Sequence, residues 1–188
     1  MQEVLAQYDN GDIDYRRFVV DTLQVAAEGI KGRQLAVAEN IAEVFYSQKE
    51  FEWFGYVKPL VEAMDSSNVN GVLLTAEPQF IAQGIAMALN MTEAHSSQFG
   101  VESDGTFAGN VVSALGSSEK GRIALQLVGC RSGSLGFGDS EGDIGMLELV
   151  DSAICIRPTD GLRSHALMNG WTVIDNPEQP DVALHFLY

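Results

Sequence analysis

Two aspartates, Asp139 and Asp143, lie four residues apart in the glycine-rich segment GFGDSEGDIGML, residues 136–147. An apolar run precedes this segment and a helical pattern follows it. Asp139 is therefore expected directly after a strand, and Asp143 in the first turn of the next helix, so both carboxylates can approach one point. Carboxylate oxygens together with water suit a hard cation such as Mg²⁺. The spacing therefore favours a magnesium site.

Two other polar residues are expected at comparable places. Thr75 ends the apolar run NGVLLT, residues 70–75, and precedes a helix whose N-terminus favours anions. Lys120 lies in the first turn of a predicted helix, in a chain with few lysines. A hydroxyl, an ammonium and a metal around one crevice form a phosphate cradle. Phosphoryl transfer needs little else beyond positioning, charge neutralisation and a nucleophile.

Each residue also has a purely structural interpretation. A lone threonine at a strand end is usually a cap, and a lone lysine near a helix start is usually a solvated charge. Asp139 could cap the following helix, and Asp143 could simply favour its dipole. It is their order on successive strand ends that favours function.

The elements that must position these residues follow from hydrophobic periodicity. Helical patterns at 12–30 and 33–48 form a hairpin punctuated by Gly32, and a third helix is expected at 50–65. The later strands are expected at 70–75, 134–137, 152–156 and 171–174, and a hairpin at 98–112 turns at Asp104-Gly105. The later helices are expected at 78–89, 117–127, 140–149 and 159–168, and Ser117 is the predicted cap of the second of these. This alternation predicts an α/β fold with a doubly wound parallel sheet, which binds ligands at the carboxyl ends of its strands.

Composition narrows the class of partner. The 188 residues carry a formal charge of −15, which argues against nucleic acid or an anionic membrane as partner. No basic start followed by an apolar stretch and no membrane-length apolar run is present in the sequence. Cys130 and Cys155 form no metal-spaced pair, so we expect two reduced, buried thiols and a cytoplasmic location. The histidines are scattered and form no ligand set.

The ordered motifs resemble those of the haloacid dehalogenase superfamily, in its phosphoserine-phosphatase-like branch. LLTAEP, SSEKGR and GFGDSEGDIGML follow one another as in that family, and the likeness runs over about residues 12–175. The hairpin with DGTFAG and the segment LELVDSAICIRPTDGLRSHALMNGWTVI resemble the same branch. The resemblance implies a Rossmann-like core with a helical cap, Mg²⁺ as cofactor and a small phosphorylated substrate.

The resemblance also assigns roles. Thr75 would hydrogen-bond the transferring phosphoryl group, and Lys120 would neutralise it and hold the nucleophile. Asp139 would bind Mg²⁺ directly, and Asp143 would support the metal and its waters. The predicted phosphate-binding set is Thr75, Ala76 and Lys120. The implied activity is Mg²⁺-dependent hydrolysis of a phosphomonoester through an aspartyl-phosphate in the complete protein.

The domain boundaries follow from the same resemblance. Residues 1–11 would be a remnant between core and cap, 12–50 the helical cap, 51–175 the core and 176–188 a tail.

The nucleophile of that family is the first aspartate of a D-x-D-x-T motif at the end of a central strand. Here DNGDID, residues 9–14, reads as a turn and helix cap, and Asp104-Gly105-Thr106 as a hairpin turn. One interpretation is an N-terminally shortened chain, inactive without the motif. The other is a protein that lost the motif and binds phosphate, Mg²⁺ or a partner without catalysis. In both, the strands that flank the first strand lack one neighbour, unless the tail DVALHFLY fills that place.

The substrate motif also departs from that branch. Thr75-Ala76-Glu77-Pro78 stands where phosphoserine phosphatases carry Ser-Gly-Gly-Phe, and Gly142 stands where they often have asparagine. These differences favour a substrate other than phosphoserine.

Overall fold

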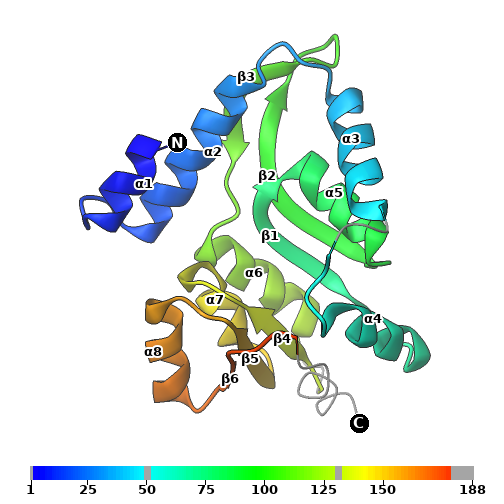
Figure 1. The fold of residues 1–188 in the computed structure, drawn as a ribbon, viewed down its shortest axis with the longest axis vertical. Coiled ribbons are helices and arrows are strands. Elements are labelled where there is room, and N and C mark those ends of the chain that lie inside the picture. The colour runs from blue at the N-terminus through cyan, green and yellow to red at the C-terminus, as the bar shows by residue number, and fades with distance from the viewer. Residues whose placement is uncertain (1, 49–51, 130–132, 179–188) are drawn as a thin grey trace. The chain divides into compact units, whose positions relative to one another are not determined.

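The computed structural model describes residues 2–48, 52–129 and 133–178, which form two compact units (Figure 1). The first unit combines the described residues up to Glu52 with residues 71–115. The second unit combines residues 53–70 with the described residues from 116 onward. The chain is a mixed α/β protein with two three-stranded sheets, one in each unit, and the predicted fold class is confirmed.

The first unit contains a sheet in the order β1-β2-β3. Its strands are β1 (Val72–Pro78), β2 (Glu93–Val101) and β3 (Phe107–Ser113), with β1 and β2 parallel and β2 and β3 antiparallel. Its helices are α1 (Gln2–Asp9), α2 (Tyr15–Gly29), α3 (Leu35–Ser47) and α5 (Gln79–Ala88). The core joins α2 to the hairpin through Leu23, Ala27, Phe99 and Phe107. Helix α3 packs beside α5, where a Cβ at Gly84 would lie 2.9 Å from the Ala42 carbonyl carbon (Figure 1).

The two aspartate-rich turns of this unit have the structural roles that the sequence predicts. Asp14 is the N-cap of α2, and its carboxylate accepts a hydrogen bond from the Arg17 amide at 2.8 Å. Asp104 accepts hydrogen bonds from the Thr106 amide and hydroxyl, and Gly105 adopts a φ of +82° that suits glycine. Both aspartates thus serve local turns, one as a helix cap and the other in the β2–β3 hairpin.

The second unit contains an all-parallel sheet in the order β4-β5-β6. Its strands are β4 (Leu135–Gly138), β5 (Ser152–Ile156) and β6 (Thr172–Ile174), and its helices are α4 (Val57–Ser66), α6 (Ser117–Val128), the 3₁₀ turn η1 (Glu141–Asp143), α7 (Ile144–Leu147) and α8 (Asp160–Asn169). After Ser152, strand β5 is apolar and buried throughout, as expected for a strand covered on both faces. One face packs with Leu147 and Leu162, and the other packs with Ile174.

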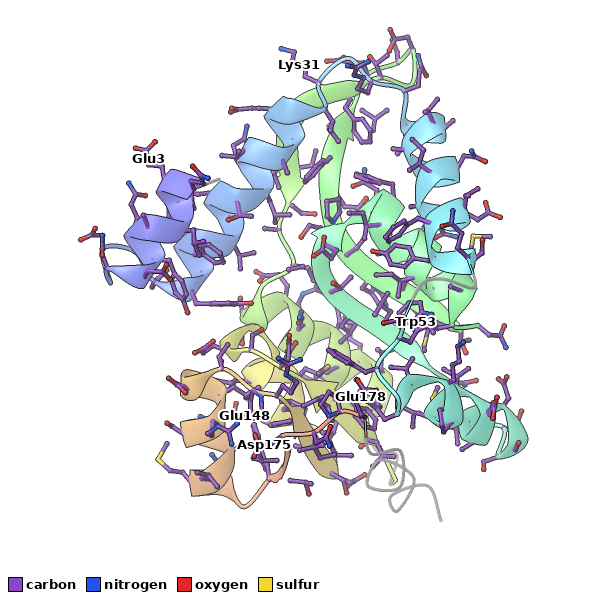
Figure 2. All side chains as sticks on the ribbon, in the orientation of Figure 1. Glu3, Lys31, Trp53, Glu148, Asp175 and Glu178 are labelled. Atoms are coloured by element: carbon purple, nitrogen blue, oxygen red, sulfur yellow. The ribbon has the colours of Figure 1, made fainter. Side chains whose placement is uncertain are left out.

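Helix α8 is also held by polar contacts to its surroundings. Arg163 pairs with Asp175, and the His165 Nε2 lies 3.3 Å from the Glu148 Oε1. Both acidic partners are labelled in Figure 2. The N-cap of α8 is Thr159, whose hydroxyl accepts from the Leu162 amide at 3.4 Å.

Several boundaries differ from the sequence prediction. The helix expected at 50–65 begins only at Val57, and residues 52–56 are not helical. The cap of α6 is Gly116 rather than Ser117, because the Ser117 hydroxyl instead accepts from the Gly145 amide at 3.1 Å. The helix expected at 140–149 divides into η1 and α7. Cys155 is a free, buried thiol as predicted, whereas Cys130 and the segment DVALHFLY lie outside the described residues.

Strands β1 and β4 each have one hydrogen-bonded neighbour within the described part of the chain. β1 pairs with β2, and β4 pairs with β5. An edge strand presents backbone donors and acceptors that no other strand satisfies.

Asp151 secures the start of β4 and provides a pH-dependent contribution to stability. Its Oδ2 accepts from the Gly133 amide at 2.7 Å, the Ser134 amide at 2.9 Å and the Ser134 hydroxyl at 3.0 Å. The Ser134 bonds lower the pKa of Asp151 most, and the Gly133 bond adds to them. A carboxyl whose folded pKa lies below its unfolded value of 3.8 contributes stability above that value. The contribution disappears as the pH falls through the folded pKa.

We therefore expect Asp151→Asn to lower the urea midpoint at about pH 7, and the difference from the unmodified chain to shrink at about pH 3. Urea unfolding of both proteins at the two pH values measures this. Asp12→Asn, at an exposed position of the first unit, is the matched control and should leave the midpoint unchanged. An Asp151→Asn effect that is equal at both pH values would contradict this account.

Among residues 2–48, 52–129 and 133–178, no helix has the length and apolar character needed to span a membrane.

Candidate functional site

A buried ion pair between α6 and the acidic loop forms the centre of the site. The Lys120 Nζ lies 2.7 Å from the Asp143 Oδ1, and the two side chains are only 8% and 6% exposed. An ammonium is seldom buried unless a carboxylate compensates it. The alternative interpretation of Lys120 as a solvated surface charge is therefore wrong. The sequence motifs SSEKGR and GDSEGD, which are far apart along the chain, meet here.

The second carboxylate oxygen of Asp143 accepts hydrogen bonds from the backbone of its own loop. The Asp143 Oδ2 accepts from the Asp139 amide at 2.9 Å and from the Ser140 amide at 3.3 Å. The turn is tight because a Cβ at Gly138 would lie 2.6 Å from the Asp143 Cβ, a distance that side chains do not tolerate. Glycine at position 138 therefore lets the Asp143 carboxylate reach the end of β4. The Asp143 carboxylate therefore joins the Lys120 ammonium to the backbone amide of Asp139.

Asp139 itself is exposed and directly follows the carboxyl end of β4. Burial raises the pKa of Asp139, and the neighbouring charge of Asp143 raises it further, while the Lys120 ammonium opposes both. Two carboxylates thus crowd one ammonium, and a cation bound at Asp139 would relieve the repulsion.

The donor set suits Mg²⁺ because it consists of carboxylate oxygens. Within the part of the chain that the structure describes, no third acidic or nitrogen ligand joins the two aspartates. Mg²⁺ is commonly bound through one or two carboxylates with several waters and substrate oxygens completing its shell. The residues present therefore fit a magnesium ion held mainly by Asp139, with Asp143 behind it.

A second loop is fastened to the acidic loop at the same edge of the sheet. The Thr159 amide donates to the Asp139 carbonyl oxygen at 2.9 Å, and the Thr159 hydroxyl donates to the Glu141 Oε2 at 2.9 Å. A Cβ at Gly161 would collide with the Glu141 carboxylate, so glycine leaves room for it at the start of α8. These contacts fix the carboxyl ends of β4 and β5 relative to one another.

Tyr56 is a site residue that the sequence analysis missed. Its ring stacks on Phe137 with a centroid distance of 6.3 Å, and Phe137 lies two residues before Asp139. Burial raises the pKa of Tyr56, and the negative charge of Asp139 raises it further. The position fell inside a predicted helix, so no strand-end signal pointed to it.

Thr75 and Ala76 lie in the first unit, whereas Lys120, Asp139 and Asp143 lie in the second. Thr75 does not end its strand as predicted, because β1 continues to Pro78. Regular pairing with β2 nevertheless stops at Leu74 and resumes only at Pro78. The Thr75 hydroxyl accepts from the Glu77 amide at 3.2 Å across this irregular stretch. The structure thus brings three of the predicted residues together, and the approach of Thr75 and Ala76 to them stays a prediction.

Close packing between α6 and α7 holds Lys120 against Asp143. A Cβ at Gly145 would lie 2.6 Å from the Ser117 carbonyl oxygen, and one at Gly121 would lie 2.8 Å from the Gly145 carbonyl oxygen. We expect Gly145→Ala to lower the free energy of unfolding by about 1–3 kcal/mol, because backbone atoms must move apart. Denaturant unfolding measures the loss. Gly29→Ala, where an added Cβ meets no atom within 4 Å, should be neutral or slightly stabilising. Equal effects of the two variants would contradict this packing role.

Solved structures with the same architecture define the class. A HAD family hydrolase from Salmonella enterica serovar Typhi superimposes with a TM-score of 0.68 at 13% identity, over 87% of this chain and 54% of that one. A phosphoserine phosphatase solved as an analogue of its phospho-aspartyl intermediate superimposes with a TM-score of 0.69 at 12% identity, over 100% and 84% of the two chains. The chain therefore has the haloacid dehalogenase-type fold.

The sequence comparison points to the same branch. A phosphoserine phosphatase of Mycobacterium tuberculosis is 30% identical over 154 residues, which cover 78% of this chain and 49% of that protein. The chain thus spans about half the length of this curated relative. No family model matches the chain. Together the relatives and the fold confirm the resemblance to the haloacid dehalogenase superfamily, in its phosphoserine-phosphatase-like branch.

Proposed function

We propose that this chain forms the metal-binding and phosphate-binding part of a Mg²⁺-dependent phosphomonoester hydrolase. The observation that carries the proposal is the buried Lys120–Asp143 pair with the exposed Asp139 beside it. Such a cluster concentrates one positive and two negative groups at the carboxyl edge of a parallel sheet, where α/β folds bind ligands. Relatives and structural neighbours named as phosphatases support the same reaction class.

Each residue has a defined part in the proposed reaction. Asp139 would hold Mg²⁺ directly and Asp143 would support the metal and its waters; when bound, Mg²⁺ supplies neutralisation of the charge on the phosphoryl oxygens. The Lys120 ammonium, held in one direction by Asp143, would orient the phosphoryl group and stabilise its equatorial oxygens. The Thr75 hydroxyl and the Ala76 amide, freed from regular pairing in β1, would donate to the remaining oxygens.

The nucleophile in this proposal is a carboxylate supplied by polypeptide outside the 188 residues. Its oxygen attacks phosphorus, the ester P–O bond breaks, and the leaving oxygen takes a proton from solvent and departs as the alcohol. Water then hydrolyses the resulting aspartyl-phosphate to inorganic phosphate and the free carboxylate. The substrate is a small phosphomonoester, and the residues at 75–78 and Gly142 favour one other than phosphoserine.

An alternative is a protein that binds phosphate or Mg²⁺ without catalysis. This alternative is favoured by the direct ion pair between Lys120 and Asp143, because the two charges neutralise each other without a bound substrate. The experiment that separates the two is a phosphate-release assay of the complete protein on a panel of small phosphomonoesters, with Mg²⁺ and with EDTA. Turnover that requires Mg²⁺ supports the enzyme. Mg²⁺ binding in calorimetry without phosphate release supports the alternative, and turnover unaffected by EDTA contradicts both.

A further inference from the structure

Arg157 directly follows β5 and has an unusual backbone conformation. Its φ is +44°, a region that residues with side chains seldom adopt. The Arg157 amide donates to the Ile174 carbonyl oxygen at 2.8 Å, so the extension of the β5–β6 ladder holds the residue there. Residues held in such regions gather at functional sites, where the surrounding structure imposes the conformation.

The position of Arg157 in the sheet places it at the same edge as Asp139. β4 and β5 are parallel, and Gly138 is the register partner of Cys155. Asp139 and Arg157 therefore both lie just beyond the carboxyl ends of neighbouring strands. The hydrogen bond from the Thr159 amide to the Asp139 carbonyl oxygen joins the two loops.

An aromatic ladder, formed by Phe54, Tyr56 and Phe137, supports the arginine side chain. The guanidinium carbon of Arg157 lies 5.7 Å from the centroid of the Phe54 ring. Phe54 stacks on Tyr56 at 6.4 Å and 16°, and Tyr56 stacks on Phe137 at 6.3 Å and 18°. A guanidinium held over a ring keeps its N–H donors available at its edges. The ladder thus runs from the arginine to Phe137 in β4, the strand that Asp139 directly follows.

The charge of Arg157 is not neutralised by the described residues. Arg17 pairs with Asp21 and Arg163 pairs with Asp175, but no carboxylate of the described segments forms an ion pair with Arg157. An exposed guanidinium on a fixed backbone can donate its free N–H groups to an anion from outside the chain.

We propose that Arg157 is a specificity-determining residue that binds a second anionic group of the substrate, a carboxylate or a second phosphate. This inference rests on the proposed function, in which Lys120 and Asp139 receive the phosphoryl group. The planar guanidinium offers two parallel N–H donors to either anion, a geometry that a lysine ammonium cannot reproduce. The substrate class is then a phosphomonoester with another negative group a few bonds away.

The test compares three two-carbon substrates of the complete protein in the presence of Mg²⁺. Ethyl phosphate has no second charge, phosphoglycolate adds a carboxylate, and ethane-1,2-diyl bisphosphate adds a phosphate. We expect Arg157→Gln to lower kcat/KM roughly 10- to 100-fold on the substrate whose second anion is recognised, as for the loss of a charged hydrogen bond. The same variant should leave ethyl phosphate within about twofold of the unmodified protein. Arg157→Lys should recover only part of the loss.

The outcomes are distinguishable. Selective loss on phosphoglycolate assigns a carboxylate, and selective loss on the bisphosphate assigns a phosphate. An equal loss on all three substrates, or no loss on any, overturns the inference. If the complete protein hydrolyses none of them, calorimetric binding of phosphoglycolate and the bisphosphate to the two proteins is compared instead. Binding that weakens in Arg157→Gln then contradicts only the proposed function, and binding that is unchanged contradicts the role of Arg157.

Discussion

Lys120→Met should lower the free energy of unfolding by about 3–5 kcal/mol, the cost typical of removing one partner from a buried ion pair. The Asp143 side chain is 6% exposed and would keep a buried negative charge without its ammonium partner. Methionine fills a similar volume, so the loss reports the charge rather than a cavity. Equilibrium unfolding in guanidinium chloride measures it.

The matched control is Lys58→Met, the same change at an exposed position of α4. It should alter stability by no more than about 0.5 kcal/mol. Adding Asp143→Asn to Lys120→Met should recover part of the loss, because the orphaned charge is removed while an amide oxygen can still accept from the Asp139 and Ser140 amides. If Lys120→Met cost no more than Lys58→Met, the buried pair would not hold the site together.

Asp139→Asn should reduce Mg²⁺-dependent turnover of the complete protein on the order of 100-fold or more, because the amide cannot replace a carboxylate as metal ligand. Its stability should stay unchanged or rise. Burial, and then the charge of Asp143, raise the pKa of Asp139. The stability contribution of this group is thus present below its unfolded pKa of 3.8 and is lost as the pH rises through the folded pKa. A neutral asparagine avoids that loss at neutral pH.

A phosphate-release assay and an unfolding curve on the same preparation separate the two effects. Asp160→Asn is the control, since this exposed aspartate lies in the first turn of α8 near the same edge of the sheet. It should leave turnover within about twofold. Full activity of Asp139→Asn would remove this residue from the metal site, and a large loss of stability would make it structural.

Local patterns predicted most of the second unit. The apolar run SAICI predicts a buried strand. The aspartates of GDSEGD come at and after the end of the neighbouring strand β4, so spacing alone could identify Asp139 and Asp143. Burial of Lys120 could not, because it depends on Gly121 and Gly145 letting two helices approach. A helix-start lysine has the same sequence pattern whether it is solvated or paired.

The segment before α4 was predicted wrongly for a different reason. Its apolar spacing continues the helical period, but residues 52–56 are held in a non-helical path by a distant part of the chain. The Gly55 amide donates to the Glu178 Oε2 at 3.1 Å, and a Cβ at Gly55 would lie 2.9 Å from the Glu178 carbonyl oxygen. Figure 2 labels Trp53 and Glu178, which come from these two segments. Contacts between residues 123 positions apart in the sequence leave no local signal. The positions of Tyr56 and of Phe54, which lies under Arg157, depend on these contacts.

The central claim is that Thr75, Lys120, Asp139 and Asp143 surround one metal-bound phosphoryl group. A crystal structure of the complete protein grown with Mg²⁺ and orthovanadate tests it most directly. The account predicts Mg²⁺ on the Asp139 carboxylate, and the Lys120 ammonium and the Thr75 hydroxyl each about 3 Å from oxygens of the same vanadate. A vanadate bound away from Lys120, or a Thr75 hydroxyl out of reach of it, would contradict the account.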